Sequence, residues 1–140
     1  MQAYVSMRKS VSPIKKHRVR ILLVEDEAYL RDIYREILGA AGYIVDEAED
    51  GEEALDALEQ GGYDLVLLDI MLPKLDGIEV LRRLKEINPT LPNGPVVIFS
   101  NLEQEDILSE GLALGARSYI VKSDVSTQEI LNEISRLLPT

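Results

Sequence analysis

Polar side chains follow four of the short apolar runs in this chain. Carboxylates come after the first and third runs, a hydroxyl and an amide after the fourth, and an amine after the fifth: Glu25, Asp26 and Glu27; Asp69; Ser100 and Asn101; Lys122. Carboxylate oxygens are the ligands that Mg²⁺ and Mn²⁺ prefer. A dinucleotide-binding or P-loop fold would instead place glycines after its first strand to receive phosphate. The pattern therefore predicts a site for Mg²⁺ or Mn²⁺.

The residue types that the chain lacks narrow the chemistry further. It has no cysteine, which excludes disulfides, thiolate nucleophiles and cysteine-ligated metal sites. Its only histidine, His17, lies near the amino terminus, away from the apolar runs. The chemistry of this chain must therefore come from carboxylates, hydroxyls and amines.

Five apolar runs alternate with five stretches of helical periodicity. The runs cover residues 19–24, 44–48, 65–68, 96–99 and 119–121, and the amphipathic stretches cover 28–41, 52–60, 78–87, 104–114 and 127–138. Continuous apolar strands between helices predict a parallel sheet covered on both faces, a doubly wound α/β fold. In such a fold the ligand site lies beyond the carboxyl ends of the strands, which is where the polar residues lie.

Two segments carry signals for the start of a helix. Asp76 and Gly77 precede the third amphipathic stretch, and we read this pair as structural, with Asp76 as the cap. Ser126 and Glu129 have the spacing of a capping box for the last helix.

Length and charge divide the chain into two parts. A chain of 140 residues that is 46% hydrophobic suits one domain, which we place at residues 18–140. Residues 1–17 form a basic leader that we expect to be disordered. The first 20 residues hold six basic groups and no acid, so the rest carries about −16. Such a body would repel nucleic acid.

The absence of a long apolar run or secretory signal predicts no membrane association and a cytoplasmic protein.

The segment LVLLDIMLPKLDGIEVL, residues 65–81, together with the polar residues at the four strand ends, resembles the receiver domains of two-component signalling. The resemblance covers Arg18 to about Leu138 and is closest to a stand-alone, chemotaxis-type receiver. It implies a flavodoxin-like sheet of five strands in the order 2-1-3-4-5, with five helices. It also implies a phosphoacceptor that catalyses its own phosphorylation and is not a turnover enzyme.

The resemblance assigns a role to each residue of the predicted site. Asp69 becomes the phosphoacceptor, and Asp26 becomes a direct Mg²⁺ ligand beside Asp69. Glu25 acts as a second acid, usually through water, and the backbone carbonyl of Met71 completes the coordination by the protein.

Three further residues are assigned to phosphoryl contact and switching. Lys122 pairs with the phosphoryl group, and Ser100 bonds one of its oxygens on activation. Tyr119 turns inward as Ser100 moves. The output is then a changed surface formed by the helix at 104–114, the strand at 119–121 and the helix at 127–138. Mg²⁺ and Lys122 would cancel the charge that otherwise repels the phosphoryl donor.

Three departures from the family pattern qualify these roles. Ser123 follows Lys122 where the family usually has a proline joined by a cis peptide, which leaves the direction of Lys122 open. Met71 and Leu102 are apolar where polar groups can orient a hydrolytic water, so we predict slow autodephosphorylation. Asn101 stands where a small residue is common and would narrow access to the site.

Each site residue also has a structural reading. Asp69 and Ser100 could be turn or capping residues, and Glu25 and Asp26 could complement a helix dipole. Lys122 could be a solvated charge. Tyr119 could equally be an ordinary half-buried aromatic residue.

Two alternative functions compete with the phosphoacceptor. A degenerate receiver could bind a protein partner without phosphorylation. The chain could also be a metal-dependent phosphatase with Asp69 as its nucleophile. Such enzymes generally need a general acid two residues after the nucleophile, and the apolar Met71 at that position argues against this function.

The expected partners are a histidine kinase or a histidine phosphotransfer protein, since the body of this chain has no histidine of its own. The downstream partner is unknown. A homodimer through the output surface is another outcome, and the basic leader could dock on an acidic partner.

Overall fold

The computed structural model describes residues 18–139, and the predicted leader at residues 1–17 lies outside them. The described residues form one parallel sheet of five strands, in the spatial order β3-β2-β4-β5-β6. Counted along the chain this is the order 2-1-3-4-5, so the predicted topology is confirmed. The strand bounds are β2 Arg20–Val24, β3 Ile44–Ala48, β4 Leu65–Leu68, β5 Val96–Ser100 and β6 Ser118–Val121.

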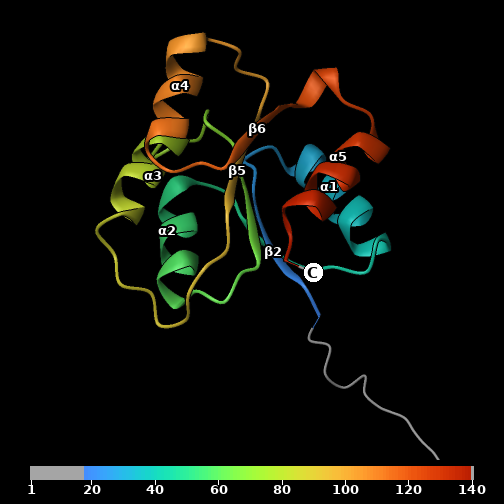
Figure 1. Ribbon diagram of the computed structural model, residues 1–140, viewed down its shortest axis with the longest axis horizontal. Coiled ribbons are helices and arrows are strands. Elements are labelled where there is room, and N and C mark those ends of the chain that lie inside the picture. Colours follow the sequence, from blue (N-terminus) through green and yellow to red (C-terminus); the bar gives the residue numbers. More distant parts are fainter. Residues whose placement is uncertain (1–17, 140) are drawn as a thin grey trace, which may run out of the picture.

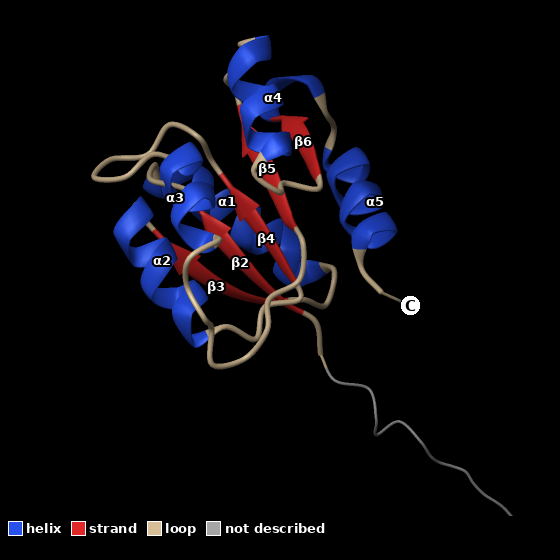
Figure 2. Cartoon of the chain, turned by 60° about the vertical axis from the view of Figure 1, so that its left-hand side comes forward, coloured by secondary structure: helices blue, strands red, loops and turns tan. Residues whose placement is uncertain are grey.

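Five helices cover the two faces of the sheet. Helices α1 and α5 lie on one face, and α2, α3 and α4 lie on the other (Figures 1 and 2). Their bounds are α1 Ala28–Ala40, α2 Gly51–Gln60, α3 Gly77–Leu84, α4 Glu105–Ala113 and α5 Thr127–Leu137. In the part that the structure describes, no helix has the length and apolar character needed to cross a membrane.

Successive side chains along each strand point to opposite faces of the sheet, and this alternation divides the core into two layers. In β2, Leu22 and Val24 pack under α2, α3 and α4, whereas Ile21 and Leu23 pack under α1 and α5. All four side chains are at most 2% exposed. Both faces of the strands are therefore buried, which explains why the strands read as continuous apolar runs.

Capping side chains start several helices where the sequence predicts them. The carboxylate of Asp76 accepts a hydrogen bond from the Glu79 amide at 2.9 Å and starts α3. Ser126 and Glu129 form both bonds of the capping box on α5. These bonds satisfy amides in the first turns of α3 and α5, so both helices begin where the sequence predicts.

The predicted end of the third helix is wrong by three residues. We predicted a helix through Ile87, but α3 ends at Leu84. Ile87 still packs against the core, so its apolar character comes from packing and not from helix periodicity. Pro89 shortly beyond disfavours helical backbone at Asn88. The short 3₁₀ helix η2, Lys122–Asp124, was not predicted.

Gly77 fixes the loop that follows β4. A Cβ atom on Gly77 would lie 2.2 Å from the carbonyl oxygen of Asp69, closer than any side chain tolerates. The Gly77 amide also donates to the Ile70 carbonyl at 2.8 Å. Only glycine therefore lets α3 begin this close to the end of β4.

Candidate functional site

The carboxyl ends of β2, β4, β5 and β6 surround a hollow of about 260 Å³. The parallel register brings these ends to one level, since Val24 pairs with Leu68 and Ser100 pairs with Val121. Every predicted site residue except Tyr119 lines this hollow. The complete lining is Glu25, Asp26, Glu27, Leu30, Asp69, Met71, Ser100, Asn101 and Lys122.

Asp69 lies at the centre of this hollow with both carboxylate oxygens engaged. It follows β4 directly and is 6% exposed. Its Oδ1 accepts hydrogen bonds from the Ser100 hydroxyl at 2.6 Å and from the Met71 amide at 3.2 Å. Its Oδ2 accepts from the Lys122 ammonium at 2.8 Å. A carboxylate held at both oxygens has a fixed orientation toward the hollow.

Lys122 joins two buried carboxylates. Its Nζ donates to Oε1 of Glu25 as well as to Oδ2 of Asp69. Burial alone would lower the pKa of Lys122, but the hydrogen bonds that Lys122 donates to Asp69 and Glu25 outweigh it and raise that pKa. The ammonium also lies 5.4 Å from the centre of the Phe99 ring. Lys122 is therefore a charged group at neutral pH and not a solvated surface lysine.

The peptide bond between Lys122 and Ser123 is trans, like every peptide bond between residues 18 and 139. Lys122 nevertheless reaches Asp69, so a serine at 123 does not turn the ammonium away from the carboxylate. The Ser123 amide donates to Oδ1 of Asn101 at 2.8 Å. Asn101 thus connects the loops after β5 and β6 while also lining the hollow.

Glu25, Asp26 and Asp69 form an acidic cluster with the donor set of a magnesium site. One carboxylate oxygen from each residue lies within 4.8 Å of the others. In octahedral Mg²⁺ coordination adjacent oxygens are about 3 Å apart and opposite ones about 4.2 Å, so the three carboxylates would draw closer together around an ion. Three carboxylates against the single Lys122 ammonium leave a net charge of −2. A divalent cation fits both the charge and the oxygen ligands.

Ser100 is part of the site, whereas Met71 lies at its rim. Ser100 is 2% exposed, and its hydroxyl oxygen accepts the Leu102 amide at 3.3 Å while donating to Asp69. Met71 is 63% exposed, and its amide is bonded to Asp69. An apolar side chain therefore stands at the entrance.

Tyr119 lies apart from these residues. It is on β6 and 45% exposed, and it lines a different hollow with residues of α5 and of the preceding loop, among them Val125 and Glu129. The predicted inward turn of Tyr119 belongs to another state and stays a prediction.

Arg31 is a site neighbour that sequence reasoning missed. Its Nη1 donates to the backbone carbonyl of Glu25 at 2.8 Å and to that of Asp26 at 3.3 Å. A positive charge in the first turn of a helix opposes the helix dipole. The basic residue in the first turn of α1 was therefore the signal that could have indicated a special role.

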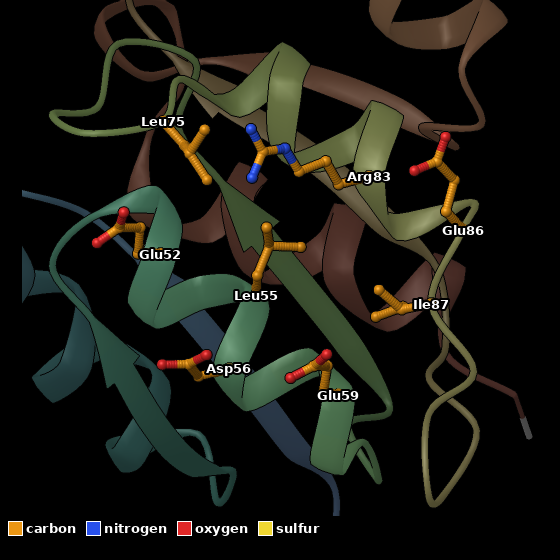
Figure 3. Close-up of a pocket in the computed structure, with 8 residues that line it drawn as sticks. All are labelled: Glu52, Leu55, Asp56, Glu59, Leu75, Arg83, Glu86 and Ile87. Atoms are coloured by element: carbon orange, nitrogen blue, oxygen red, sulfur yellow. The ribbon is translucent and has the colours of Figure 1, made fainter.

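A larger hollow of about 540 Å³ lies between α2 and α3 (Figure 3). Its floor is apolar, with Leu55, Leu75 and Ile87, and its charged residues, such as Glu59, are exposed. The Nε of Arg83 bonds Glu79 at 3.0 Å, outside the lining. Because this hollow brings no buried polar groups together, the candidate site is the hollow around Asp69.

Comparison with known proteins gives one consistent result. A family model described as the response regulator receiver domain matches residues 21–135. The gliding motility regulatory protein of Myxococcus xanthus is 39% identical over 120 residues, which are 86% of this chain and 15% of that protein. The transcriptional regulatory protein ResD of Bacillus subtilis is 37% identical over 122 residues, 87% of this chain and 49% of ResD. This chain thus spans about half or less of these relatives.

Solved structures show the same fold over most of the chain. A CheY-like response regulator receiver domain protein from Methanospirillum hungatei has a TM-score of 0.77 at 28% identity, covering 86% of this chain and 93% of that one. CheY in the CheX-CheY-BeF3-Mg²⁺ complex from Borrelia burgdorferi is similar, with a TM-score of 0.74 at 30% identity and coverage of 84% and 87%.

Proposed function

Because this chain belongs to the response regulator receiver family, we propose that it accepts a phosphoryl group on Asp69 in a Mg²⁺-dependent reaction. The observation that carries the proposal is the geometry of Asp69 itself. Its buried carboxylate contacts the Lys122 ammonium and the Ser100 hydroxyl, and it shares an acidic cluster with Glu25 and Asp26. This arrangement supports a phosphoacceptor and not a turnover enzyme.

The proposed donor is a phosphohistidine on a kinase or a phosphotransfer protein. An oxygen of Asp69 attacks the phosphorus, and the bond between phosphorus and the donor nitrogen breaks. The electron pair of that bond stays on the imidazole, which then takes up a proton. The product on this chain is an acyl phosphate.

The residues around Asp69 have separate tasks in this transfer. Lys122 balances negative charge on the phosphoryl oxygens from the β6 side, and Ser100 donates to one of these oxygens from the β5 side. Glu25, Asp26, Asp69 and the Met71 carbonyl are the groups that would hold the metal. Bound Mg²⁺ would neutralise phosphoryl charge and draw the donor to the carboxylate.

The switch that we propose uses the same contacts. In the described state, Ser100 and Lys122 bond the bare carboxylate of Asp69. A phosphoryl group on that carboxylate offers both residues new oxygens farther from β4, which favours a second arrangement of the loops after β5 and β6. Tyr119 would turn inward in that arrangement, and the surface of α4, β6 and α5 would change.

Two features bear on the proposed partners. The acidic body disfavours direct binding to nucleic acid. The similar CheY from Borrelia burgdorferi is found in a complex with CheX, BeF3 and Mg²⁺, which supports a metal site and a protein partner. The downstream partner would bind the surface of α4, β6 and α5, and a second copy of the chain is one such partner.

Intact mass spectrometry tests the proposed function. The protein is incubated with Mg²⁺ and a small acyl-phosphate donor, alongside Asp69→Asn and a sample treated with a chelator. Asp76→Asn is the matched control, since Asp76 is an exposed helix cap near the same loop. We expect a gain of one phosphoryl group in the native chain and in Asp76→Asn only. Equal labelling of Asp69→Asn, or no labelling of the native chain, contradicts the proposal.

A further inference from the structure

Arg31 contacts the backbone of two of the three acidic residues that precede α1. Its side chain is only 12% exposed. Nη1 donates to the Glu25 carbonyl at 2.8 Å and to the Asp26 carbonyl at 3.3 Å. The carboxylates of these two residues belong to the acidic cluster. Arg31 therefore holds the main chain of the cluster without being a ligand.

The same guanidinium is anchored on the neighbouring strand. Its Nε lies 3.9 Å from Oε1 of Glu47, and its Nη2 lies 3.7 Å from Oε2 of Glu49. These residues lie at the end of β3 and just after it. Arg31 thus joins the turn after β2 to the end of β3 through two hydrogen bonds to carbonyls and two longer ion pairs.

Other contacts to the turn after β2 hold mainly its two ends: Lys122 bonds the Glu25 carboxylate, and the Arg31 amide donates to the Glu27 carbonyl at 2.9 Å. The Glu25 amide donates to the Ala48 carbonyl at 3.0 Å, and the Glu27 amide donates to Oε2 of Glu25 at 3.1 Å. The N-cap residue Glu27 makes no side-chain capping bond to α1. Three consecutive carboxylates also repel one another. A buried cation bonded to the carbonyls of two of them opposes that repulsion.

We propose that Arg31 is a positioning residue for the metal site: its guanidinium holds the turn in the shape that presents the Glu25 and Asp26 carboxylates to a divalent cation. This inference rests on the proposed function for its metal. It concerns a group that touches neither the cation nor the phosphoryl group.

The shape of the guanidinium makes it possible to test whether Arg31 acts through the geometry of its hydrogen bonds or only through its positive charge. Its planar array of donors faces the two carbonyls on one side and the carboxylates of Glu47 and Glu49 on the other. A lysine at 31 keeps the charge but offers one compact ammonium, which cannot span both sets of acceptors. Arg31→Lys therefore separates the two explanations.

Arg35 provides a matched control on the same helix. It lies one turn farther along α1 and bonds Glu47 at 2.8 Å and Asp32 at 2.9 Å. It shares an ion-pair partner with Arg31 but has no bond to the carbonyl of Glu25 or Asp26. Arg35→Met thus removes the same charge and leaves the turn in place.

Titration calorimetry with Mg²⁺ on the full chain measures the predicted effect. Loss of a group that orients metal ligands typically weakens metal affinity by about 10- to 100-fold. We expect Arg31→Met to weaken Mg²⁺ affinity by about tenfold or more and Arg31→Lys to weaken it by several-fold. Arg35→Met should stay within about twofold of the native chain.

Amide hydrogen exchange without metal gives a second readout. We expect faster exchange of the Glu27 amide in Arg31→Met and Arg31→Lys, and unchanged exchange in Arg35→Met. If the native chain binds no Mg²⁺, the proposed function loses its metal, and the exchange data alone decide the role of Arg31. If Arg31→Met does not fold, Arg31→Lys supplies both readouts.

Three results would overturn the inference. The first is native Mg²⁺ affinity in Arg31→Met. The second is equal weakening in Arg31→Met and Arg35→Met, which would assign the effect to net charge. The third is native affinity together with native exchange in Arg31→Lys.

Discussion

The ammonium of Lys122 lies 2.8 Å from Oδ2 of Asp69 and also bonds Glu25, so one cation just after β6 pairs with acids that follow β2 and β4. This contact has two opposite consequences. Under the proposed function, Lys122 would assist a phosphoryl group on Asp69 but would also compete with Mg²⁺ for the oxygens of Glu25 and Asp69. The two effects can be separated by substitution.

Lys122→Met should therefore change metal binding and phosphorylation in opposite directions. Removal of the ammonium leaves three carboxylates unbalanced, so we expect Mg²⁺ affinity to rise several-fold. Phosphorylation by a small acyl-phosphate donor should slow by about tenfold or more, since a charge that stabilises the transition state is lost. Calorimetry and intact mass measure the two effects. Lys85→Met, at an exposed position after α3, is the control. Slower phosphorylation with weaker Mg²⁺ binding would contradict this account.

Mg²⁺ should stabilise the folded chain. A ligand at 100 times its dissociation constant adds about 2.7 kcal/mol to the free energy of unfolding. We expect a higher melting temperature with Mg²⁺ and a loss of this shift in Asp26→Asn. Glu36→Gln, an exposed change on α1, should keep the shift. Thermal unfolding with and without a chelator measures it, and an equal shift in Asp26→Asn would exclude Asp26 as a ligand.

The phosphorylated form should decay slowly. Met71 is exposed at the rim of the site, and Leu102 follows Ser100 by two residues, so neither offers a polar group to orient water. We expect a lifetime of minutes or longer, shortened by Met71→Asn and by Leu102→Gln. Loss of the phosphoryl mass over time measures the rate. Decay of the native form within seconds would contradict the prediction.

Gly77→Ala should destabilise the fold and slow phosphorylation. The new Cβ would overlap the Asp69 carbonyl, so the loop that carries Asp69, the proposed phosphoacceptor, must shift. Gly39→Ala is a matched control, because α1 has open space around Gly39 and alanine there should stabilise by about 0.5–1 kcal/mol. Denaturant unfolding compares the two variants. Equal stability of both would show that the close approach of α3 to β4 is not required.

Tyr63 should contribute to stability in a way that is lost in strong alkali. Burial first, and then its hydrogen bond to Asp46 at 2.8 Å, raise the pKa of Tyr63 from 10.0 to about 12. A raised pKa in the folded state means that the contribution is complete below pH 10 and disappears as the pH rises toward 12. The difference in unfolding free energy between the native chain and Tyr63→Phe should therefore shrink over this range. A difference that is constant from pH 9 to 12 would contradict the assignment.

The sequence predicted the strands closely because their burial on both faces leaves an unambiguous apolar signal. The bounds of all five differ from the prediction by at most one residue at either end. The last residues of α3 were predicted wrongly, because Ile87 is apolar for packing reasons and lies beyond the helix. Periodicity alone does not distinguish these causes.

The site was predictable to the extent that it depends on strand ends. Asp69, Ser100 and Lys122 meet because parallel strands end at one level. The role of Arg31 was not visible, because its partners at Glu25 and Asp26 are backbone carbonyls, which every residue type carries. The direct pair between Lys122 and Glu25 depends on side-chain conformation, which spacing does not specify.

The position of Lys122 in the sheet has a mechanical consequence. Strand β6 is the outermost strand on its side and is paired only with β5. Its carboxyl end is tied inward by Lys122, through Asp69, to a strand two places away. The proposed phosphorylation of one carboxylate would thus alter the tether of an edge strand, which has backbone bonds to a neighbour on one side only.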